Sequence, residues 1–192
     1  MDRYWFLTWR TYGTWLPGSR DGFVDPILAA DGNRVIHNIP GTPVDADNPA
    51  LENYAKTIMK GKPVYLNEEQ AKALLEQCQE TARFRHWHLV AVAILINHIH
   101  LIVGVDGDPD PADLLRDFKA YGSRRLNRQW PKPADGSWWA ESGSRRRLKL
   151  DENVVAVTEY VMKQESPLLV WQPSRPAPPA PAIRPTPPAP AG

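Results

Sequence analysis

Two histidines lie two positions apart inside an apolar run, ILINHIHLIVGV, which extends from Ile94 to Val105. In a β-strand, residues i and i+2 point to the same face, so His98 and His100 are expected to project together while Ile99 and Leu101 point into the packed side. Imidazole rings buried without partners are energetically costly. We therefore interpret the pair either as hydrogen-bonded core residues or as two ligands of one divalent metal ion.

A tyrosine and a glutamine four positions apart supply further groups for metal-assisted chemistry. Tyr160 and Gln164 belong to the stretch EYVMKQ, and residues i and i+4 of a helix share one face. An amide oxygen is a hard donor that suits magnesium or manganese, and a phenol beside such an ion can act as a nucleophile. Taken alone, the Tyr–Gln pair favours the interpretation of Tyr160 as a core tyrosine whose hydroxyl reaches the surface.

Tyr121, in FKAYGSRRLNR, is a competing candidate for the nucleophile. It lies closer to the histidines in the sequence, but the residue four positions later is Arg125, which offers no donor oxygen. It also belongs to a basic helix that we assign to backbone contacts with a nucleic acid. Tyr160 is therefore the preferred candidate.

Positive charge is concentrated in one part of the chain. The formal net charge is +1, yet residues 111–150 carry ten Lys and Arg against four Asp and Glu. Such a stripe can hold phosphates, with a solvated helix face as the alternative. Tryptophans among arginines can stack on unpaired bases, or they can simply pack a loop. The candidate DNA-binding residues are Lys119, Arg124, Arg125, Arg128, Arg145, Arg146, Arg147, Trp138 and Trp139.

The pattern of helices and strands predicts how these residues are positioned. Helices are expected at 67–87 with Asn67 as cap, at 110–130 with Asp110 as cap and Pro111 at the first position, and at 151–165. Strands are expected at 3–17, 88–96, 97–105 and 147–150. The order β-α-β-β-α-β predicts an α+β fold: a ferredoxin-like antiparallel sheet with helices on one face and an extra C-terminal helix.

One domain is expected to fill residues 1–170, because 192 residues allow a single core. Residues 18–63, rich in turn-forming residues, are interpreted as a subelement inserted after the first strand, with a small hairpin at RVIHNI. Residues 171–192 are rich in proline and are expected to be a disordered tail. No apolar run could cross a membrane, and the single Cys78 cannot form an internal disulfide, so we expect a cytoplasmic protein.

A His-hydrophobe-His strand followed by a helix with Tyr-x-x-x-Gln resembles the HUH single-tyrosine transposases. The opening YWFLTWRTYGTWLPG, the strand INHIHLIVGV and the basic helix LLRDFKAYGSRRLNRQW are similar to the branch known as REP-associated tyrosine transposases. The likeness extends from about Tyr4 to Gln164. It implies the ferredoxin-like fold with both histidines on a central strand.

The resemblance also implies a reaction and its partners. His98, His100 and Gln164 would hold Mg²⁺ or Mn²⁺, and Tyr160 would attack a phosphodiester of single-stranded DNA. Cleavage would leave a free 3′ hydroxyl and a 5′ phosphate linked to the tyrosine, and rejoining would follow. The DNA would carry a hairpin, and the protein would be a monomer or a homodimer. The alternatives are a DNA-hairpin-binding protein that is domesticated or has lost its chemistry, and a metal-dependent nuclease that uses water.

Overall fold

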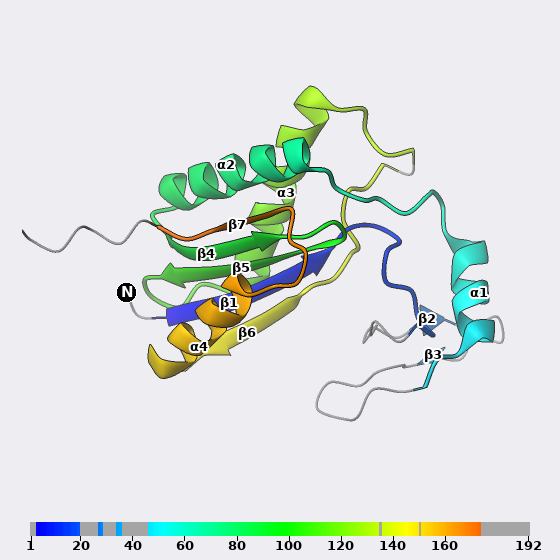
Figure 1. Cartoon of the computed structure of the whole chain (residues 1–192), viewed down its shortest axis with the longest axis horizontal. Coiled ribbons are helices and arrows are strands. Elements are labelled where there is room, and N and C mark those ends of the chain that lie inside the picture. The colour runs from blue at the N-terminus through cyan, green and yellow to red at the C-terminus, as the bar shows by residue number, and fades with distance from the viewer. Residues whose placement is uncertain are drawn as a thin grey trace, which may run out of the picture.

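The computed structural model describes residues 3–19, 27–28, 34–35, 46–134, 136–149 and 151–173, and a single large sheet forms its centre (Figure 1). The elements that build this centre follow the chain in the order strand, helix, strand, strand, helix, strand. They are β1 (Arg3–Arg10), α2 (Glu68–Phe84), β4 (His88–Ile94), β5 (His98–Val105), α3 (Pro111–Gln129) and β6 (Ser144–Leu148). The predicted β-α-β-β-α-β order is confirmed.

The sheet is antiparallel throughout, with the strand order β6-β1-β5-β4-β7, where β7 is Leu169–Trp171. The first core strand, β1, therefore lies beside β5, the strand that carries both histidines. In this register Thr8 is opposite His100, and Arg10 is opposite His98. The register thus decides which residues from the start of the chain surround the histidines.

Local sequence signals set the N-terminal ends of the two long helices. Asn67 and Gln70 form a capping box, in which each side-chain oxygen accepts a hydrogen bond from the backbone N–H of the other residue. Asp110 caps α3 by accepting a 2.8 Å hydrogen bond from the backbone N–H of Ala112, and Pro111 occupies the first helical position. Both predicted caps are confirmed.

The two faces of the sheet carry different layers of helix. Leu7 and Leu101 point to the face covered by α2 and α3, where the larger hydrophobic core lies. Ile102 points to the other face, against Val157 and Val161 of α4 (Asp151–Met162). In Figure 1, α4 lies in front of the sheet and α3 passes behind it. As predicted, α2 and α3 of the β-α-β-β-α-β unit share one face of the sheet. The extra C-terminal helix, α4, covers the opposite face.

The insertion after β1 contains a short hairpin and one helix. β2 (Ile27–Leu28) pairs antiparallel with β3 (Arg34–Val35), and α1 (Pro49–Ile58) follows. The first two residues of the predicted RVIHNI hairpin form β3, their partner strand β2 lies earlier in the chain, and residues 36–39 lie outside the described residues. The helix α1 was not predicted, because only Leu51 and Ala55 of this helix are buried and its surroundings are rich in turn residues. Its start is nevertheless locally encoded, since the Asn48 side chain accepts a 3.1 Å hydrogen bond from the backbone N–H of Leu51.

The C-terminal part of the chain adds a further strand to the sheet. β7 pairs with β4, and Trp171 packs against the larger core, so regular structure extends to Trp171, while the domain boundary after residue 170 stays a prediction. Residues 174–192, most of the predicted disordered tail, lie outside the described residues. The strand predicted at 147–150 is β6, which begins earlier, at Ser144. None of the described helices is long and apolar enough to span a lipid bilayer.

Candidate active site

His98 and His100 converge on the face of the sheet that α4 covers. Their Nε2 atoms are 3.1 Å apart, and their ring centroids are 4.7 Å apart. Only 6% of the surface of His100 is exposed, while His98 is half-buried. The structure therefore brings the two rings together as their two-residue spacing predicts.

The other nitrogen of each ring is held by a neighbouring residue. His98 Nδ1 lies 2.7 Å from Oδ1 of Asn97, and because an amide oxygen only accepts, the ring nitrogen must donate its proton. A neutral His98 with its proton on Nδ1 has a lone pair on Nε2. His100 Nδ1 lies 2.8 Å from Oγ1 of Thr8, its cross-strand neighbour. Partners of this kind orient metal-binding imidazoles in proteins.

The surroundings of both imidazoles favour the neutral ring. Burial and, secondly, the guanidinium of Arg10 lower the pKa of His98 to about 4. Burial and, secondly, the neighbouring His98 lower the pKa of His100 to about 3. Arg10 is itself buried, and its guanidinium lies 5.3 Å from the centroid of the Trp15 ring, which in turn is 5.1 Å from the ring of His98. Because metal ions bind neutral imidazole, protons would compete with a metal only in acid.

The histidine pair fits a divalent metal ion. Two ligand atoms that each lie ~2.1 Å from one ion, at a right angle, are about 3.0 Å apart. The two Nε2 atoms are 3.1 Å apart and both rings are braced at Nδ1. Within the ranges that the structure describes, no group of three or more His, Cys, Asp and Glu could hold an ion. A third protein ligand from this part of the chain would thus be a residue of another type.

Tyr160 lies beside the histidine pair. It belongs to α4, and its ring centroid is 5.6 Å from that of His100, with the two rings inclined by 64°. Phe6 of β1 stacks on His100 at 5.3 Å and meets Tyr160 edge-on at 6.2 Å. Tyr160 is 53% exposed, so the phenol is accessible to a large substrate. The structure therefore unites the tyrosine and the histidines, which are far apart in the sequence.

Gln164 lies just beyond the end of α4, and its side chain turns back along the helix. Its amide nitrogen donates a 3.0 Å hydrogen bond to the backbone carbonyl of Tyr160. Among the described residues, no hydrogen bond links Gln164 to His98 or His100. The structure therefore brings Tyr160 to the histidines but leaves the metal-ligand role of Gln164 as a prediction.

The competing Tyr121 lies on the other side of the sheet. It belongs to α3, which packs on the face opposite α4, and its ring lies under the guanidinium of Arg124 at 5.1 Å. His98 and His100 point toward the α4 face. The sheet therefore separates Tyr121 from the two histidines. This separation favours Tyr160 over Tyr121 as the candidate nucleophile.

Comparison with known proteins shows which family this site belongs to. The family model described as "Transposase IS200 like" matches residues 57–164, more than half of the chain. The chain belongs to the IS200-like transposase family. The match includes both histidines and Tyr160, and it ends at Gln164. The family predicted from the sequence motifs is thus confirmed.

Two solved structures are similar to this chain. One is a REP-associated tyrosine transposase bound to a REP hairpin, with 12% sequence identity and a TM-score of 0.47, and the match covers 83% of this chain and 64% of that one. The other is a candidate transposase from Deinococcus radiodurans R1, with 14% identity and a TM-score of 0.42, covering 86% and 94%. The chain thus spans less than two thirds of the first structure. No curated protein matches the chain in sequence.

The three consecutive arginines of β6 point to different faces of the sheet. Arg146 is opposite Phe6, and its guanidinium lies 5.4 Å from the Phe6 ring, on the face of the histidines and Tyr160. Arg145 and Arg147 alternate with it and are therefore directed toward the other face. Of the three arginines, only Arg146 lies on the candidate active-site face of the sheet.

Some of the predicted DNA-binding residues of α3 already bind other residues of the protein, whereas others are exposed. The Lys119 ammonium donates to three carbonyls, those of Ala140, Glu141 and Ser142, at 2.6, 2.7 and 3.3 Å. Burial and the nearby Arg10 lower the pKa of Lys119 to about 8, partly opposed by Glu141. Arg125 pairs with Glu76 of α2 at 2.5 Å. The side chains that remain exposed for phosphate contacts are those of Arg124 and Arg128.

Trp138 and Trp139 are not exposed stacking platforms. They are 5% and 6% exposed and belong to the larger core. The Trp138 indole donates to Asn127 Oδ1 at 2.8 Å, and the Trp139 indole donates to the carbonyl of Lys119 at 2.9 Å. Both therefore anchor the loop after α3, so the alternative interpretation, that they pack this loop, is correct.

Four residues at the site were not selected from the sequence. Phe6, Thr8 and Arg10 reach it from β1, and Trp15 follows that strand. The two-residue spacing of Phe6, Thr8 and Arg10 is a signal that they share a face, but it does not say that β5 is the neighbouring strand. Their functional meaning depends on the register of two distant segments.

Proposed function

We propose that this transposase cleaves and rejoins single-stranded DNA in a metal-dependent reaction, with Tyr160 as nucleophile and a 5′-phosphotyrosine intermediate. His98, His100 and Gln164 would hold the ion, Mg²⁺ or Mn²⁺. One observation carries the proposal: the Tyr160 ring is 5.6 Å from the His100 ring, on the face where the two imidazole Nε2 atoms converge. A nucleophile and a pair of metal-type ligands thus share one exposed surface.

The proposed reaction is a transesterification at phosphorus. The Tyr160 oxygen loses its proton to solvent and forms a bond to phosphorus, while the bond from phosphorus to the 3′ oxygen breaks and that oxygen takes up a proton. The phosphate stays on the tyrosine through its 5′ side. The 3′ hydroxyl of a second strand then attacks this phosphorus and releases the phenol. Because each step exchanges one ester for another, no nucleotide cofactor is needed.

The residues around the reacting groups have separate tasks in this proposal. A bound divalent ion would supply Lewis-acid stabilisation of charge on the phosphate oxygens. Asn97 and Thr8 hold the imidazoles in place through their Nδ1 atoms. Phe6, packed against both His100 and Tyr160, sets the separation between the two rings.

The proposal for Gln164 as third ligand rests on its chemistry and its place in the chain. It follows Tyr160 by four residues, and its bond to the Tyr160 carbonyl uses the amide nitrogen rather than the oxygen. An amide oxygen is a suitable donor for Mg²⁺ or Mn²⁺. In this proposal the Gln164 side chain would exchange its backbone hydrogen bond for a bond to the ion.

The proposed substrate is single-stranded DNA that carries a neighbouring hairpin. The motif resemblance implies the hairpin, and exposed cations support a phosphate backbone as the ligand. Arg146 lies on the candidate active-site face, while Arg124 and Arg128 are exposed on α3. Affinity for such a ligand is expected to fall as the salt concentration rises.

The test is to trap the covalent intermediate. Wild-type protein, Tyr160→Phe and the matched control Tyr121→Phe are incubated with Mn²⁺ and labelled single strands taken from around the gene, hairpins included. We expect labelled protein on denaturing gels for the wild type and Tyr121→Phe, and none for Tyr160→Phe. Peptide mass spectrometry then identifies the modified tyrosine.

The other outcomes identify the rival functions. Cleavage without any adduct would assign a nuclease that uses water. Tight hairpin binding with neither cleavage nor adduct would assign a DNA-binding protein that lacks this chemistry. An adduct that persists in Tyr160→Phe would assign a different nucleophile.

A further inference from the structure

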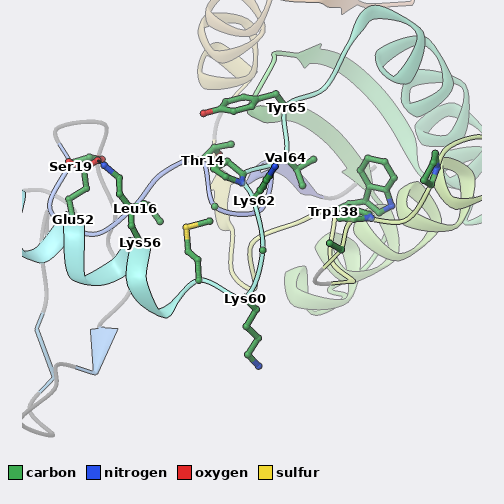
Figure 2. Close-up of a pocket in the computed structure, with 17 residues that line it drawn as sticks. Thr14, Leu16, Ser19, Glu52, Lys56, Lys60, Lys62, Val64, Tyr65 and Trp138 are labelled. Carbon is green, nitrogen blue, oxygen red and sulfur yellow. Dashed lines mark ion pairs between the residues drawn. The ribbon is translucent and has the colours of Figure 1, made fainter.

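A large groove lies between the insertion and the body of the protein, apart from the histidine pair. Its volume is about 1120 Å³, and three segments distant in sequence line it: 13–19, 52–65 and 131–138. Figure 2 shows Thr14, Lys62, Val64 and Tyr65 gathered in the middle of this lining, with Glu52 and Lys56 of α1 on one side and Trp138 on the other. Small-molecule sites usually enclose about 300–1,000 Å³, so the groove is large enough for a segment of a polymer.

Hydrogen bonds connect residues at the groove to the turn before β5, the strand that carries His98 and His100. The hydroxyl of Thr14, in the groove lining, donates to the Thr11 carbonyl at 3.1 Å and lies 3.3 Å from the carbonyl of Asn97, the residue whose side chain holds His98. The Thr11 hydroxyl donates to the same Asn97 carbonyl at 3.0 Å. Leu66, which directly follows the lining residue Tyr65, donates from its backbone N–H to the carbonyl of Ile96 at 2.7 Å. Trp15, next to Thr14, packs against the His98 ring. A polymer strand that lies in the groove would therefore continue toward the histidine pair.

The charge of the groove suits a polyanion. Glu52 is the one acid among the described lining residues, and it is already paired with Lys56 at 2.7 Å. Lys60 and Lys62 also line the groove, are exposed, and form no ion pair with any residue that the structure describes. These two ammonium groups leave the groove with uncompensated positive charge.

The groove also offers an aromatic surface of the kind that unpaired bases use. Tyr65 is 58% exposed, although most large aromatic side chains of the protein are at least partly buried. Stacking of a base on an exposed aromatic ring, next to a cation for the phosphate, is the usual mode of binding to single-stranded nucleic acid. A duplex hides its base faces, so this combination favours an unpaired strand.

We propose that this groove binds the unpaired DNA segment next to the phosphodiester that Tyr160 attacks, with Tyr65 stacking on a base and Lys62 contacting a phosphate. The proposal rests on the function proposed above for its substrate, but it concerns a separate surface. The insertion after β1 would then contribute to the choice of the cleaved strand rather than to chemistry.

The test measures binding apart from cleavage. The probe is a fluorescein-labelled, unpaired oligonucleotide of about ten nucleotides, within the range of known single-strand sites, about 4–16 nucleotides. Full-length variants are titrated by fluorescence anisotropy in EDTA, so that no metal-dependent step interferes. We expect Tyr65→Ala to weaken binding about tenfold, and Tyr65→Phe to leave it unchanged, because the stacking ring is retained. Phe84→Ala, which removes another exposed aromatic ring outside the groove, is the matched control.

The lysine is tested through salt dependence. Lys62→Ala should reduce the slope of log affinity against log salt by about 0.7, the value for one phosphate of a single strand. Lys72→Ala, an exposed lysine of α2 that does not line the groove, should leave the slope unchanged. A photo-crosslink from a 4-thiothymidine probe should map to the peptide that contains Tyr65.

The outcomes separate this proposal from the proposed function. If Tyr65→Ala and Lys62→Ala bind the probe like the wild type, or if the controls weaken it equally, the groove assignment is overturned even where Tyr160 forms its adduct. If the groove variants lose binding while the wild type forms no adduct with any DNA, the groove assignment stands and the tyrosine chemistry fails.

Discussion

The ring of Tyr160 lies 5.6 Å from the ring of His100, although α4 and β5 are separated along the chain by a long helix and an edge strand. The contact exists because α4 returns to the sheet on the face opposite α2 and α3 and packs there through Val157 and Val161. The other tyrosine considered, Tyr121, belongs to a helix on the wrong face. The position of α4 thus explains why a tyrosine near the C-terminus is paired with histidines from the middle of the chain.

Thr8 is expected to control metal affinity through His100. Its hydroxyl lies 2.8 Å from His100 Nδ1, so Thr8→Val, which preserves the shape of the side chain, would leave that nitrogen without its partner. Loss of such a partner usually weakens metal binding about 10- to 100-fold. We expect Thr8→Val to need about 10- to 100-fold more Mn²⁺ for half-maximal cleavage, with little change in the rate at saturating metal. Equal Mn²⁺ requirements for the variant and the wild type would show that the hydrogen bond between Thr8 and His100 does not affect metal affinity.

The fold was predictable where short-range signals define it. Asn67 with Gln70, and Asp110 with Pro111, mark the starts of α2 and α3 by hydrogen bonds within one turn. The alternation of His98 and Ile99 likewise fixes which side chains leave the same face of β5. β7 was missed because three edge-strand residues contain too little pattern to recognise.

The site was predictable in its residue types but not in its surroundings. His98, His100 and Tyr160 stand out because of their chemistry and spacing. Thr8 contacts His100 across 92 positions of sequence, which only the pairing of β1 with β5 determines. The burial of Trp138 was not predicted for a similar reason, since burial by tertiary packing is invisible in a local pattern of tryptophans and arginines.

Arg146 is expected to matter for cleavage more than its neighbours. It lies over Phe6 on the candidate active-site face, whereas Arg147 is opposite Trp5 and faces the other way. Arg146→Ala should lower kcat/KM for DNA cleavage about tenfold, the effect of losing one charge-assisted contact of ~1.4 kcal/mol. Arg147→Ala is the matched control and should lower it by less than about threefold. Equal losses in single-turnover measurements would mean that the arginines act only through diffuse attraction of DNA.

Lys119 and Arg128 are expected to have different roles despite lying on the same helix. Lys119→Met removes the donor to three loop carbonyls and should destabilise the protein by about 1–2 kcal/mol, which corresponds to a Tm lower by roughly 2–8 °C. Arg128 is exposed, so Arg128→Ala should leave Tm unchanged and reduce the salt dependence of DNA binding. Thermal denaturation and anisotropy at several salt concentrations measure both. A Lys119→Met protein with normal Tm but a reduced salt slope would make Lys119 a DNA contact after all.

The histidine pair is expected to make the metal-free protein less stable in mild acid. The pKa of His98 is lowered to about 4 and that of His100 to about 3, against the ordinary value of 6.5 that the unfolded chain retains. Below pH 6.5 the unfolded chain therefore takes up protons that the folded protein does not. The stability contributed by the neutral pair is complete above that pH and is lost as the pH falls toward 4 and 3, by at most about 1.4 kcal/mol per pH unit for each histidine.

Urea unfolding at several pH values, in EDTA, measures this effect against a matched variant. His98→Asn/His100→Asn carries no titratable ring at either position, so its stability should fall less steeply between about pH 6.5 and pH 4 than that of the wild type. His88→Asn, which replaces an exposed histidine outside the site, is measured alongside as the control substitution. Parallel curves for the wild type and the double variant would mean that the two imidazoles titrate alike in the folded and unfolded protein. That result would contradict the conclusion that the folded protein keeps both imidazoles neutral and able to bind a metal ion.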